Sequence, residues 1–140
     1  LEEIKVGTGR KLKDGDQVAI LTVGPIGNDA QKAIEALPQR DNVAHYDMRF
    51  IKPLDGDLLD EIGKKFKKVI TIEDGIRNGG FGSAVLEWFN DHGYAPSVQR
   101  MGLPDEFVTH GSVDELRRIV GLDAPHIKQN IEAMLASEQV

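Results

Sequence analysis

Between Val69 and Phe89 the chain reads VITIEDGIRNGGFGSAVLEWF. An apolar, β-rich run is followed directly by an acidic turn, a glycine cluster and an amphipathic helical pattern. This order is typical of the corner between a parallel strand and the helix that follows it. Open α/β sheets place ligand and partner contacts at such corners, so we expect this one to belong to the functional surface.

The alternation of strands and helices continues on both sides of this corner. Short apolar runs predict strands at 17–23, 43–48, 69–72 and 97–101. Apolar residues at helical spacing predict helices at 28–37, between Asp55 and Phe66, at 80–92, and after both Ser112 and Asp123. Short connections in such a pattern imply parallel strands with right-handed crossovers. The sequence therefore predicts a three-layer α/β/α sandwich with a mostly parallel sheet of about five strands.

The residues before the first of these strands carry a turn signal. Lys13-Asp14-Gly15-Asp16 has the composition of a tight turn between antiparallel strands. We therefore expect a hairpin that adds an antiparallel edge strand before 17–23. No repeat, low-complexity tract or linker interrupts the pattern, so residues 1–140 are expected to form a single domain.

Composition limits the class of protein and its partners. With 40% hydrophobic and 29% charged residues, and no apolar run near the roughly 20 residues that cross a membrane, we expect a soluble globular domain. A net charge of −6 disfavours nucleic acid as a partner. The absence of cysteine excludes disulfides and thiolate chemistry and is compatible with a cytoplasmic location. The chain begins at Leu1 without a leader, so we expect a piece of a longer protein.

The glycine cluster at the corner has two interpretations. Gly79, Gly80 and Gly82, with Ser83 at the start of the predicted helix, could present backbone amides to an anion. However, the cluster lacks the lysine of a phosphate loop, and its spacing differs from that of a dinucleotide fingerprint. A tight turn that brings backbone against backbone is therefore the favoured interpretation.

Two acidic residues and the histidines are candidates for catalytic or metal-binding groups. Glu73 and Asp74 could form a general acid and base pair, but neighbouring residues in a strand point in different directions, so a strand-ending acidic turn is favoured. The four histidines are scattered, without the pairing that favours zinc, so we predict no metal ligand. His110, in VTHGS, lies in a loop where it could face a partner or a substrate; a solvated histidine is the alternative.

Three blocks carry a resemblance to a known family. They are YDMRFIKPLD at 46–55, Glu73 with GGFGS at 79–83, and GLPDEF at 102–107 with GLDA at 121–124. Together they resemble the C-terminal domain of the 1-deoxy-D-xylulose-5-phosphate synthase family. The glycine block is shared with the wider transketolase superfamily, including the β subunits of 2-oxo-acid dehydrogenases. The other two blocks favour the synthase.

The resemblance implies a parent enzyme that condenses pyruvate with glyceraldehyde 3-phosphate. Carbon dioxide is released, and the product is a precursor of isoprenoids, thiamine and pyridoxal. Thiamine diphosphate and Mg²⁺ serve this family and are expected outside this domain, because Glu73-Asp74-Gly75 lacks the first glycine of the family's Gly-Asp-Gly motif. We therefore predict no catalytic, cofactor-binding or metal-binding residue here, and no activity of the chain alone.

The resemblance also implies an interface role. The predicted partners are the preceding domains of the same chain and a second subunit in a homodimer, with an exposed apolar patch at the contact. The candidate contact residues are Glu73, Gly79, Gly80, Phe81, Gly82 and Ser83, with His110 in a further loop. Two alternatives stay open: another parent in the superfamily, such as a transketolase or a 2-oxo-acid dehydrogenase β subunit, and a stand-alone binding module.

Overall fold

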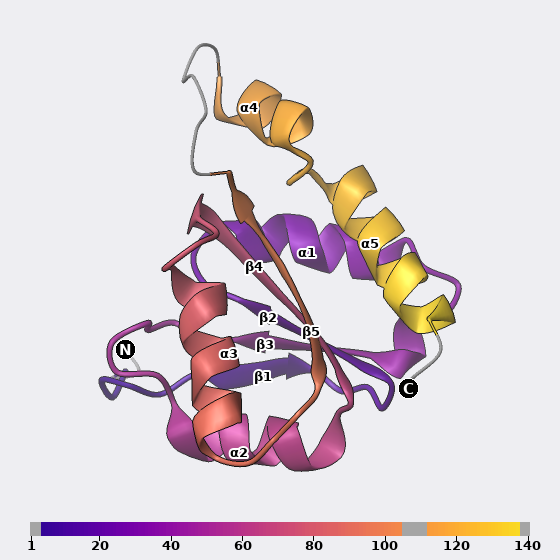
Figure 1. The fold of residues 1–140 in the computed structure, drawn as a ribbon. Helices are drawn as coiled ribbons and strands as arrows, with labels where there is room; N and C mark the ends of the chain where they lie inside the picture. The colour runs from indigo at the N-terminus through magenta and orange to yellow at the C-terminus, as the bar shows by residue number, and fades with distance from the viewer. Residues whose placement is uncertain (1–3, 105–111, 138–140) are drawn as a thin grey trace.

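The computed structural model describes residues 4–104 and 112–137, which form a five-stranded sheet between two layers of helices (Figure 1). The elements are β1 (Arg10–Lys13), β2 (Val18–Thr22), α1 (Ile26–Glu35), the short 3-10 turn η1 (Arg40–Asn42), β3 (Val43–Asp47), α2 (Gly56–Lys65), β4 (Lys68–Ile76), α3 (Phe81–Asp91), β5 (Ser97–Leu103), α4 (Val113–Val120) and α5 (Ala124–Ala136). Each predicted strand and helix is present, and β4 extends beyond its predicted end at Ile72.

The strand order is β1-β3-β2-β4-β5. Strands β3, β2, β4 and β5 are parallel, while β1 pairs antiparallel with β3. The predicted antiparallel edge strand is therefore confirmed, but the predicted hairpin is wrong, because β1 does not pair with β2.

The turn after β1 passes around the start of β3 instead. The backbone amides of Asp16 and Gln17 both donate to the carbonyl of Asn42. A Cβ on Gly15 would overlap the backbone of Val43 and Ala44. The glycine signal in the sequence thus marks a close approach of two backbones rather than a two-residue hairpin loop.

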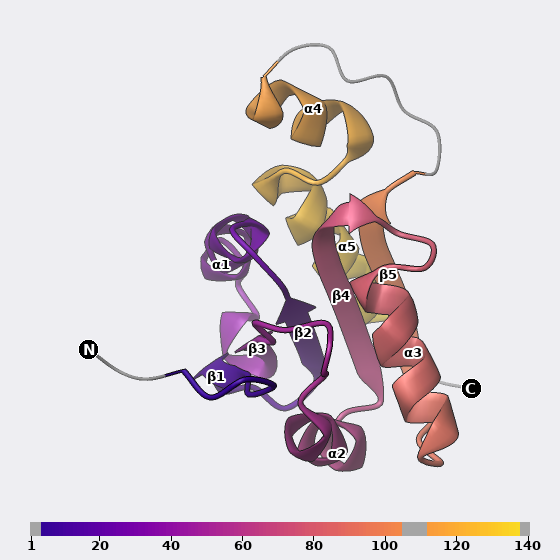
Figure 2. The same cartoon turned by 90° about the vertical axis from the view of Figure 1, so that its left-hand side faces the viewer.

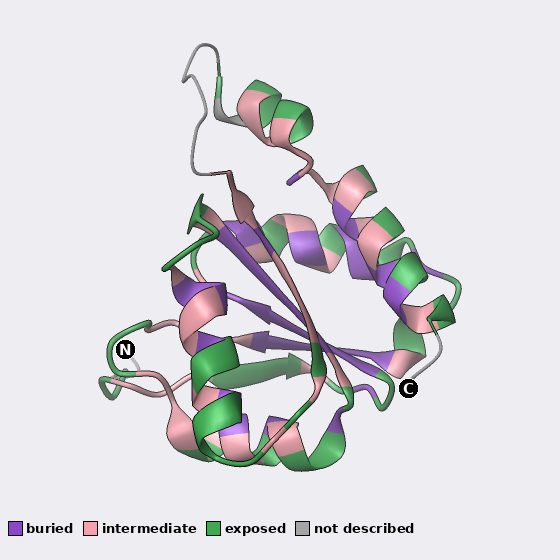
Figure 3. Cartoon of the chain, in the orientation of Figure 1, coloured by how far each residue is buried: buried purple, intermediate pink, exposed green. Residues whose placement is uncertain are grey.

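Alternate residues of β2 enter two separate cores. Val18 and Ile20 pack with α1 and α5, whereas Ala19 and Leu21 pack with α2 and α3. Figures 1 and 2 show these helix pairs on opposite faces of the sheet. Every residue of β2 is buried, as expected for the central strand of a parallel sheet covered on both faces (Figure 3).

Side-chain caps fix the starts of three helices. The Asp55 carboxylate accepts from the Leu58 amide at 3.0 Å, and Ser112 and Asp123 accept in the same way from Glu115 and His126. The predicted helix starts after Asp55, Ser112 and Asp123 are therefore confirmed. Among the described helices, none combines the length and the apolar character needed to cross a membrane.

Helix α4 stands apart from the sheet at the top of Figure 1. Its Ile119 side chain is 63% exposed, although Leu122, just after the helix, is buried in the core beside α1 and α5. The helix ends at Gly121, whose φ of 78° lies in the left-handed region that favours glycine. A single arginine on this helix connects it to the strand ends described next.

Candidate functional site

The corner between β4 and α3 is organised around the carboxylate of Glu73. This side chain is only 3% exposed, and its Oε1 and Oε2 accept from the backbone amides of Phe81 at 3.0 Å and Gly82 at 2.8 Å. These amides belong to the first turn of α3 and have no partner within the helix. Glu73 therefore caps α3 from the preceding strand with charge-assisted hydrogen bonds, where the helix dipole also favours a negative charge.

The glycines of the corner make this arrangement possible. Gly79 has a φ of 80°, which side-chain-bearing residues rarely adopt. A Cβ on Gly80 would lie 2.5 Å from the carbonyl oxygen of Ile76 and would overlap the Glu73 carboxylate. A Cβ on Gly82 would lie 2.5 Å from Thr71 Oγ1. The tight-turn interpretation is confirmed. Of the amides in the anion interpretation, that of Gly82 donates to Glu73 and that of Gly79 donates to Ser83.

The hydroxyl of Ser83 joins the turn to the neighbouring strand. It accepts from the Gly79 amide at 3.0 Å and from Arg100 Nη1 of β5 at 2.8 Å, and it donates to the Arg77 carbonyl at 3.1 Å. Three separate parts of the corner are therefore held by one side chain.

The predicted contact residues divide into two groups by burial. Glu73, Phe81 and Gly82 are buried, so they hold the corner from beneath. Gly79 is exposed, and Gly80 and Ser83 are half-buried, so these three residues reach the surface of the domain. His110 lies outside the described residues, and its predicted role stays a prediction.

Asp74 points away from Glu73 and binds Arg117 of α4. Arg117 donates from Nε and Nη2 to the two Asp74 oxygens at 3.0 and 2.9 Å, and from Nη1 to Asp29 of α1 at 2.9 Å. The hydrogen bonds to Asp74 raise the pKa of Arg117, whose side chain is 15% exposed. The strand-ending turn predicted at Glu73 and Asp74 is wrong, because β4 continues through both residues to Ile76, and their carboxylates bind different partners. Separations of 43 and 88 residues left no local signal for this cluster in the sequence.

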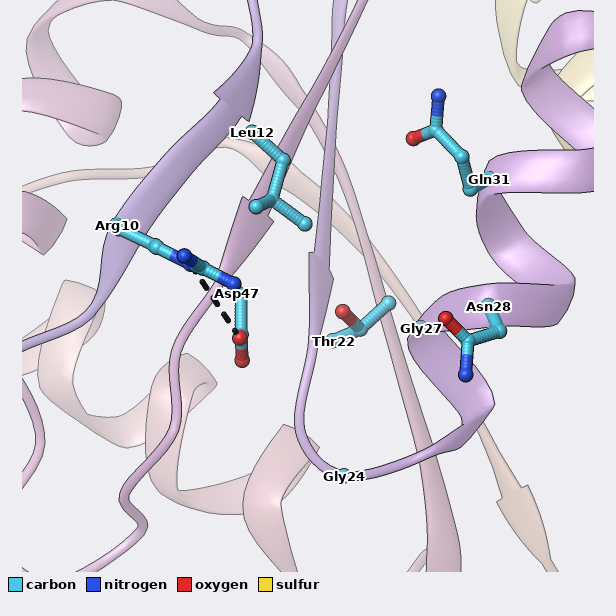
Figure 4. A pocket seen from close by; sticks show the side chains of 8 residues that line it. All are labelled: Arg10, Leu12, Thr22, Gly24, Gly27, Asn28, Gln31 and Asp47. Carbon is cyan, nitrogen blue, oxygen red and sulfur yellow. Dashed lines mark ion pairs between the residues drawn. The ribbon is translucent and has the colours of Figure 1, made fainter. Parts of the chain in front are cut away.

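A second polar region lies at the carboxyl ends of β2 and β3. Here a pocket of about 400 Å³ is lined by Arg10, Leu12, Thr22, Gly24, Gly27, Asn28, Gln31 and Asp47 (Figure 4). Behind its wall, the fully buried His45 contacts Thr22 Oγ1 through Nε2 at 2.9 Å and Gln31 Oε1 through Nδ1 at 3.1 Å.

The surroundings of His45 define its protonation. Burial lowers the pKa of His45 to about 4, so the ring is neutral near pH 7. With Gln31 oriented to present its carbonyl oxygen, Nδ1–H donates to it and Nε2 accepts from the Thr22 hydroxyl. Both ring nitrogens are therefore satisfied inside the core, and this histidine has a structural role. Among the described residues, no group of three acidic or histidine side chains is placed to hold a metal ion.

Comparison with known proteins settles the family. The profile of the transketolase C-terminal domain family, described as "Transketolase, C-terminal domain", matches residues 7–127. The chain belongs to this family. The resemblance of its three sequence blocks to a transketolase-superfamily C-terminal domain is thereby confirmed.

Relatives of this transketolase C-terminal domain share a common name. The chain is 50% identical over 133 residues to the 1-deoxy-D-xylulose-5-phosphate synthase of Parabacteroides distasonis, and the match covers 94% of this chain and 21% of the relative. It is 55% identical over 125 residues to the synthase of Bacteroides fragilis, covering 88% of this chain and 19% of the relative. The chain thus spans about a fifth of the length of the relatives it matches.

A solved structure supports the same architecture. The protein described as "Split gene transketolase, inactive beta4 tetramer" superposes with a TM-score of 0.85 at 28% sequence identity. The match covers 99% of this chain and 44% of the other. The predicted α/β/α fold of a transketolase C-terminal domain is therefore confirmed.

Proposed function

We propose that this chain is the C-terminal domain of a 1-deoxy-D-xylulose-5-phosphate synthase. The parent enzyme condenses pyruvate with glyceraldehyde 3-phosphate, with loss of carbon dioxide, to give 1-deoxy-D-xylulose 5-phosphate. The observation that carries this proposal is the 50% identity over 133 residues to a relative of that name. The 28% identity to a split-gene transketolase gives less support to a transketolase parent.

The residues of this domain do not fit the cofactor of that reaction. Thiamine diphosphate is held through Mg²⁺, which requires free oxygen ligands on the protein. The Glu73 carboxylate is not free to bind a metal, because its two oxygens accept hydrogen bonds from the α3 amides. The same holds for Asp74, whose two oxygens accept from Arg117. We therefore assign cofactor and metal binding to the preceding domains, and we expect this chain to be inactive alone. A cytoplasmic location is compatible with a chain that has no cysteine.

The role we propose for the domain is structural. The turn around Gly79, Gly80 and Ser83 would contact a preceding domain or the second subunit of a homodimer. Two apolar side chains near this turn support the assignment: Ile76, at the end of β4, is 46% exposed, and Leu86 of α3 is also exposed. Apolar surface of this kind is favoured at permanent interfaces.

An assay of the full-length protein tests the proposed reaction. Pyruvate and glyceraldehyde 3-phosphate are supplied, and release of carbon dioxide and formation of deoxyxylulose 5-phosphate are measured. We expect both products at equal rates. Transfer of a two-carbon unit between sugar phosphates, or acyl transfer to a lipoyl group, would instead identify one of the alternative parents. A full-length gene product that carries none of these activities would favour the binding-module alternative.

A charge substitution tests the interface role. Ile76→Glu in the full-length enzyme is expected to lower the fraction of assembled subunits, measured by light scattering after size-exclusion chromatography, because it buries a charge in the contact. Leu12→Glu is the matched control, since Leu12 on the edge strand β1 is 44% exposed and distant in the sheet order from β4. Equal assembly of both variants and the unaltered enzyme would reject the assignment of this corner to an interface.

A further inference from the structure

The pocket of Figure 4 lies on the sheet face that carries α1, beside that helix. Val43 of β3 packs in the core formed with α1 and α5, so the alternation of side chains along the strand places Asp47 on the same face. Arg10 of β1 is the cross-strand partner of Asp47 and shares this face. Among the described residues, β1 contributes none to either core, so the sheet beside α1 is left uncovered here. The strands thus form one wall of the pocket and α1 the other (Figure 4).

An acid and a base face each other in this pocket without a hydrogen bond between them. Asp47 Oδ2 lies 3.9 Å from Arg10 Nε, beyond the roughly 3.2 Å of an N–H···O hydrogen bond. Asp47 Oδ1 accepts from the Arg49 amide at 3.1 Å, which fixes the carboxylate. Within residues 4–104 and 112–137, Asp47 Oδ2 and the Arg10 guanidinium take part in no hydrogen bond. Both groups therefore keep hydrogen-bonding capacity for a ligand.

The wall formed by α1 is rigid and adds one further polar group. The Asn28 side chain points from α1 into the pocket and makes no hydrogen bond in the described part of the chain (Figure 4). Beside it, Thr22 and Gln31 are both held by the buried ring of His45. A Cβ on Gly24, at the end of β2, would meet nothing within 4 Å, so the pocket is open there. The side chain of Asn28 thus offers a donor and an acceptor against a fixed background.

We propose that this pocket binds a small zwitterion, an α-amino acid with a short apolar side chain. The ammonium group donates to Asp47 Oδ2, and the carboxylate accepts from the Arg10 guanidinium and the Asn28 NH₂ group. An anion alone would be repelled by Asp47 and a cation alone by Arg10, whereas a zwitterion is attracted by both. Leu12, which is 44% exposed and lines the pocket, provides an apolar contact for the ligand side chain.

The size and position of the pocket agree with such a ligand. Its volume of about 400 Å³ lies within the roughly 300 to 1,000 Å³ of small-molecule sites. It lies at the carboxyl ends of β2 and β3, where open α/β sheets bind ligands. The proposal does not depend on the reaction assigned to the parent enzyme.

Hydrogen–deuterium exchange of the full-length protein tests the site locally. Exchange is followed in peptides that cover 22–31 and 45–49 while L-alanine, L-valine, propionate or ethylamine is titrated at constant ionic strength. Propionate lacks the ammonium group, and ethylamine lacks the carboxylate. We expect slower exchange in both peptides with at least one of the amino acids and no change with propionate or ethylamine. Equal protection by propionate or by ethylamine, or no protection by either amino acid, would overturn the proposal.

Substitutions separate a specific site from general attraction of charge. Asp47→Asn keeps an acceptor for the Arg49 amide, and Arg10→Met keeps the length of the side chain. Each removes one charge of the pocket and should raise the apparent Kd for the amino acid about tenfold or more. Asp47→Asn should also abolish the preference for the amino acid over propionate, which a loss of stability alone would not do.

Two exposed residues outside the pocket provide controls of equal charge change. They are Asp41→Asn in η1 and Lys32→Met in α1. Both controls should bind the amino acid as the unaltered protein does. Weakening by Lys32→Met equal to that by Arg10→Met, or by Asp41→Asn equal to that by Asp47→Asn, would show non-specific attraction and reject the site.

Discussion

Replacing Glu73 by glutamine should destabilise the domain although it changes the shape of the side chain very little. The buried carboxylate accepts from the Phe81 and Gly82 amides at 3.0 and 2.8 Å. A glutamine has one carbonyl oxygen and one NH₂ group. It can therefore accept from one of the two amides, while its NH₂ group faces the other and leaves that amide without an acceptor.

The magnitude follows from these two hydrogen bonds. A hydrogen bond to a charged group contributes about 1.5 to 3 kcal/mol, and a negative charge at a helix N-terminus adds roughly 0.5 to 1 kcal/mol. Glu73→Gln retains one neutral hydrogen bond of about 1 kcal/mol and avoids part of the cost of burying a charge. We therefore expect the free energy of unfolding to fall by about 2 to 4 kcal/mol.

Urea denaturation followed by circular dichroism and by the fluorescence of Trp88, the one tryptophan in the sequence, measures this change. The midpoint should fall while the slope with urea stays constant. Glu87→Gln is the matched control, because Glu87 is an exposed residue of α3 and its substitution should change stability by less than about 0.5 kcal/mol. If Glu73→Gln were as stable as this control, the carboxylate could not be the main cap of α3.

Three further substitutions probe the remaining contacts. Arg117→Ala should raise amide exchange in α4 roughly tenfold or more while α1 is unaffected, because α4 loses the hydrogen bonds to two other elements. Burial lowers the pKa of His45 to about 4 from 6.5. As the pH falls, His45 therefore becomes protonated in the unfolded chain before it does in the folded chain. The free energy of unfolding should drop by about 3 kcal/mol between pH 6.5 and 4 for this reason. His45→Gln should remove that slope and His92→Gln should keep it, in urea melts at each pH. Gly82→Ala should cost about 1 to 3 kcal/mol through its contact with Thr71 Oγ1, and adding Thr71→Ala should restore much of the loss.

Features that depend on residues close together in the chain were predictable from the sequence. The unbroken apolar runs of β2 and β4 indicated strands covered on both faces, and the capping residues Asp55, Ser112 and Asp123 indicated helix starts. The end of β4 was predicted less accurately, at Ile72 instead of Ile76. Glu73 and Gly75 have the composition of a turn, yet the strand continues through an irregular register to pair Ile76 with Leu103.

Features that depend on distant contacts were not predictable. The same turn composition at Gly15 suits a hairpin and a connection that passes around the start of β3. Which of the two forms depends on which strand pairs with the edge of β2, and that strand is β3. Arg117 is one of several basic residues on exposed-looking helices, and only the fold brings it to Asp29 and Asp74. His45 lies in a short apolar run, and its hydrogen-bond partners Thr22 and Gln31 are 23 and 14 residues away in the chain, so its buried hydrogen bonds carried no sequence signal.

The corner between β4 and α3 combines exposed backbone with unusual local order. At Gly79 a Cβ would meet nothing within 4 Å, so the absence of a side chain there lets a partner approach the peptide groups of the turn closely. Such a turn would ordinarily be flexible, and ordering it on association would cost about 1 to 2 kcal/mol for each residue fixed. Here Glu73 and Ser83 already hold the turn through hydrogen bonds to Phe81, Gly82, Gly79, Arg77 and Arg100. Folding of the domain therefore meets the ordering cost in advance, which is the property expected of a surface that binds a permanent partner.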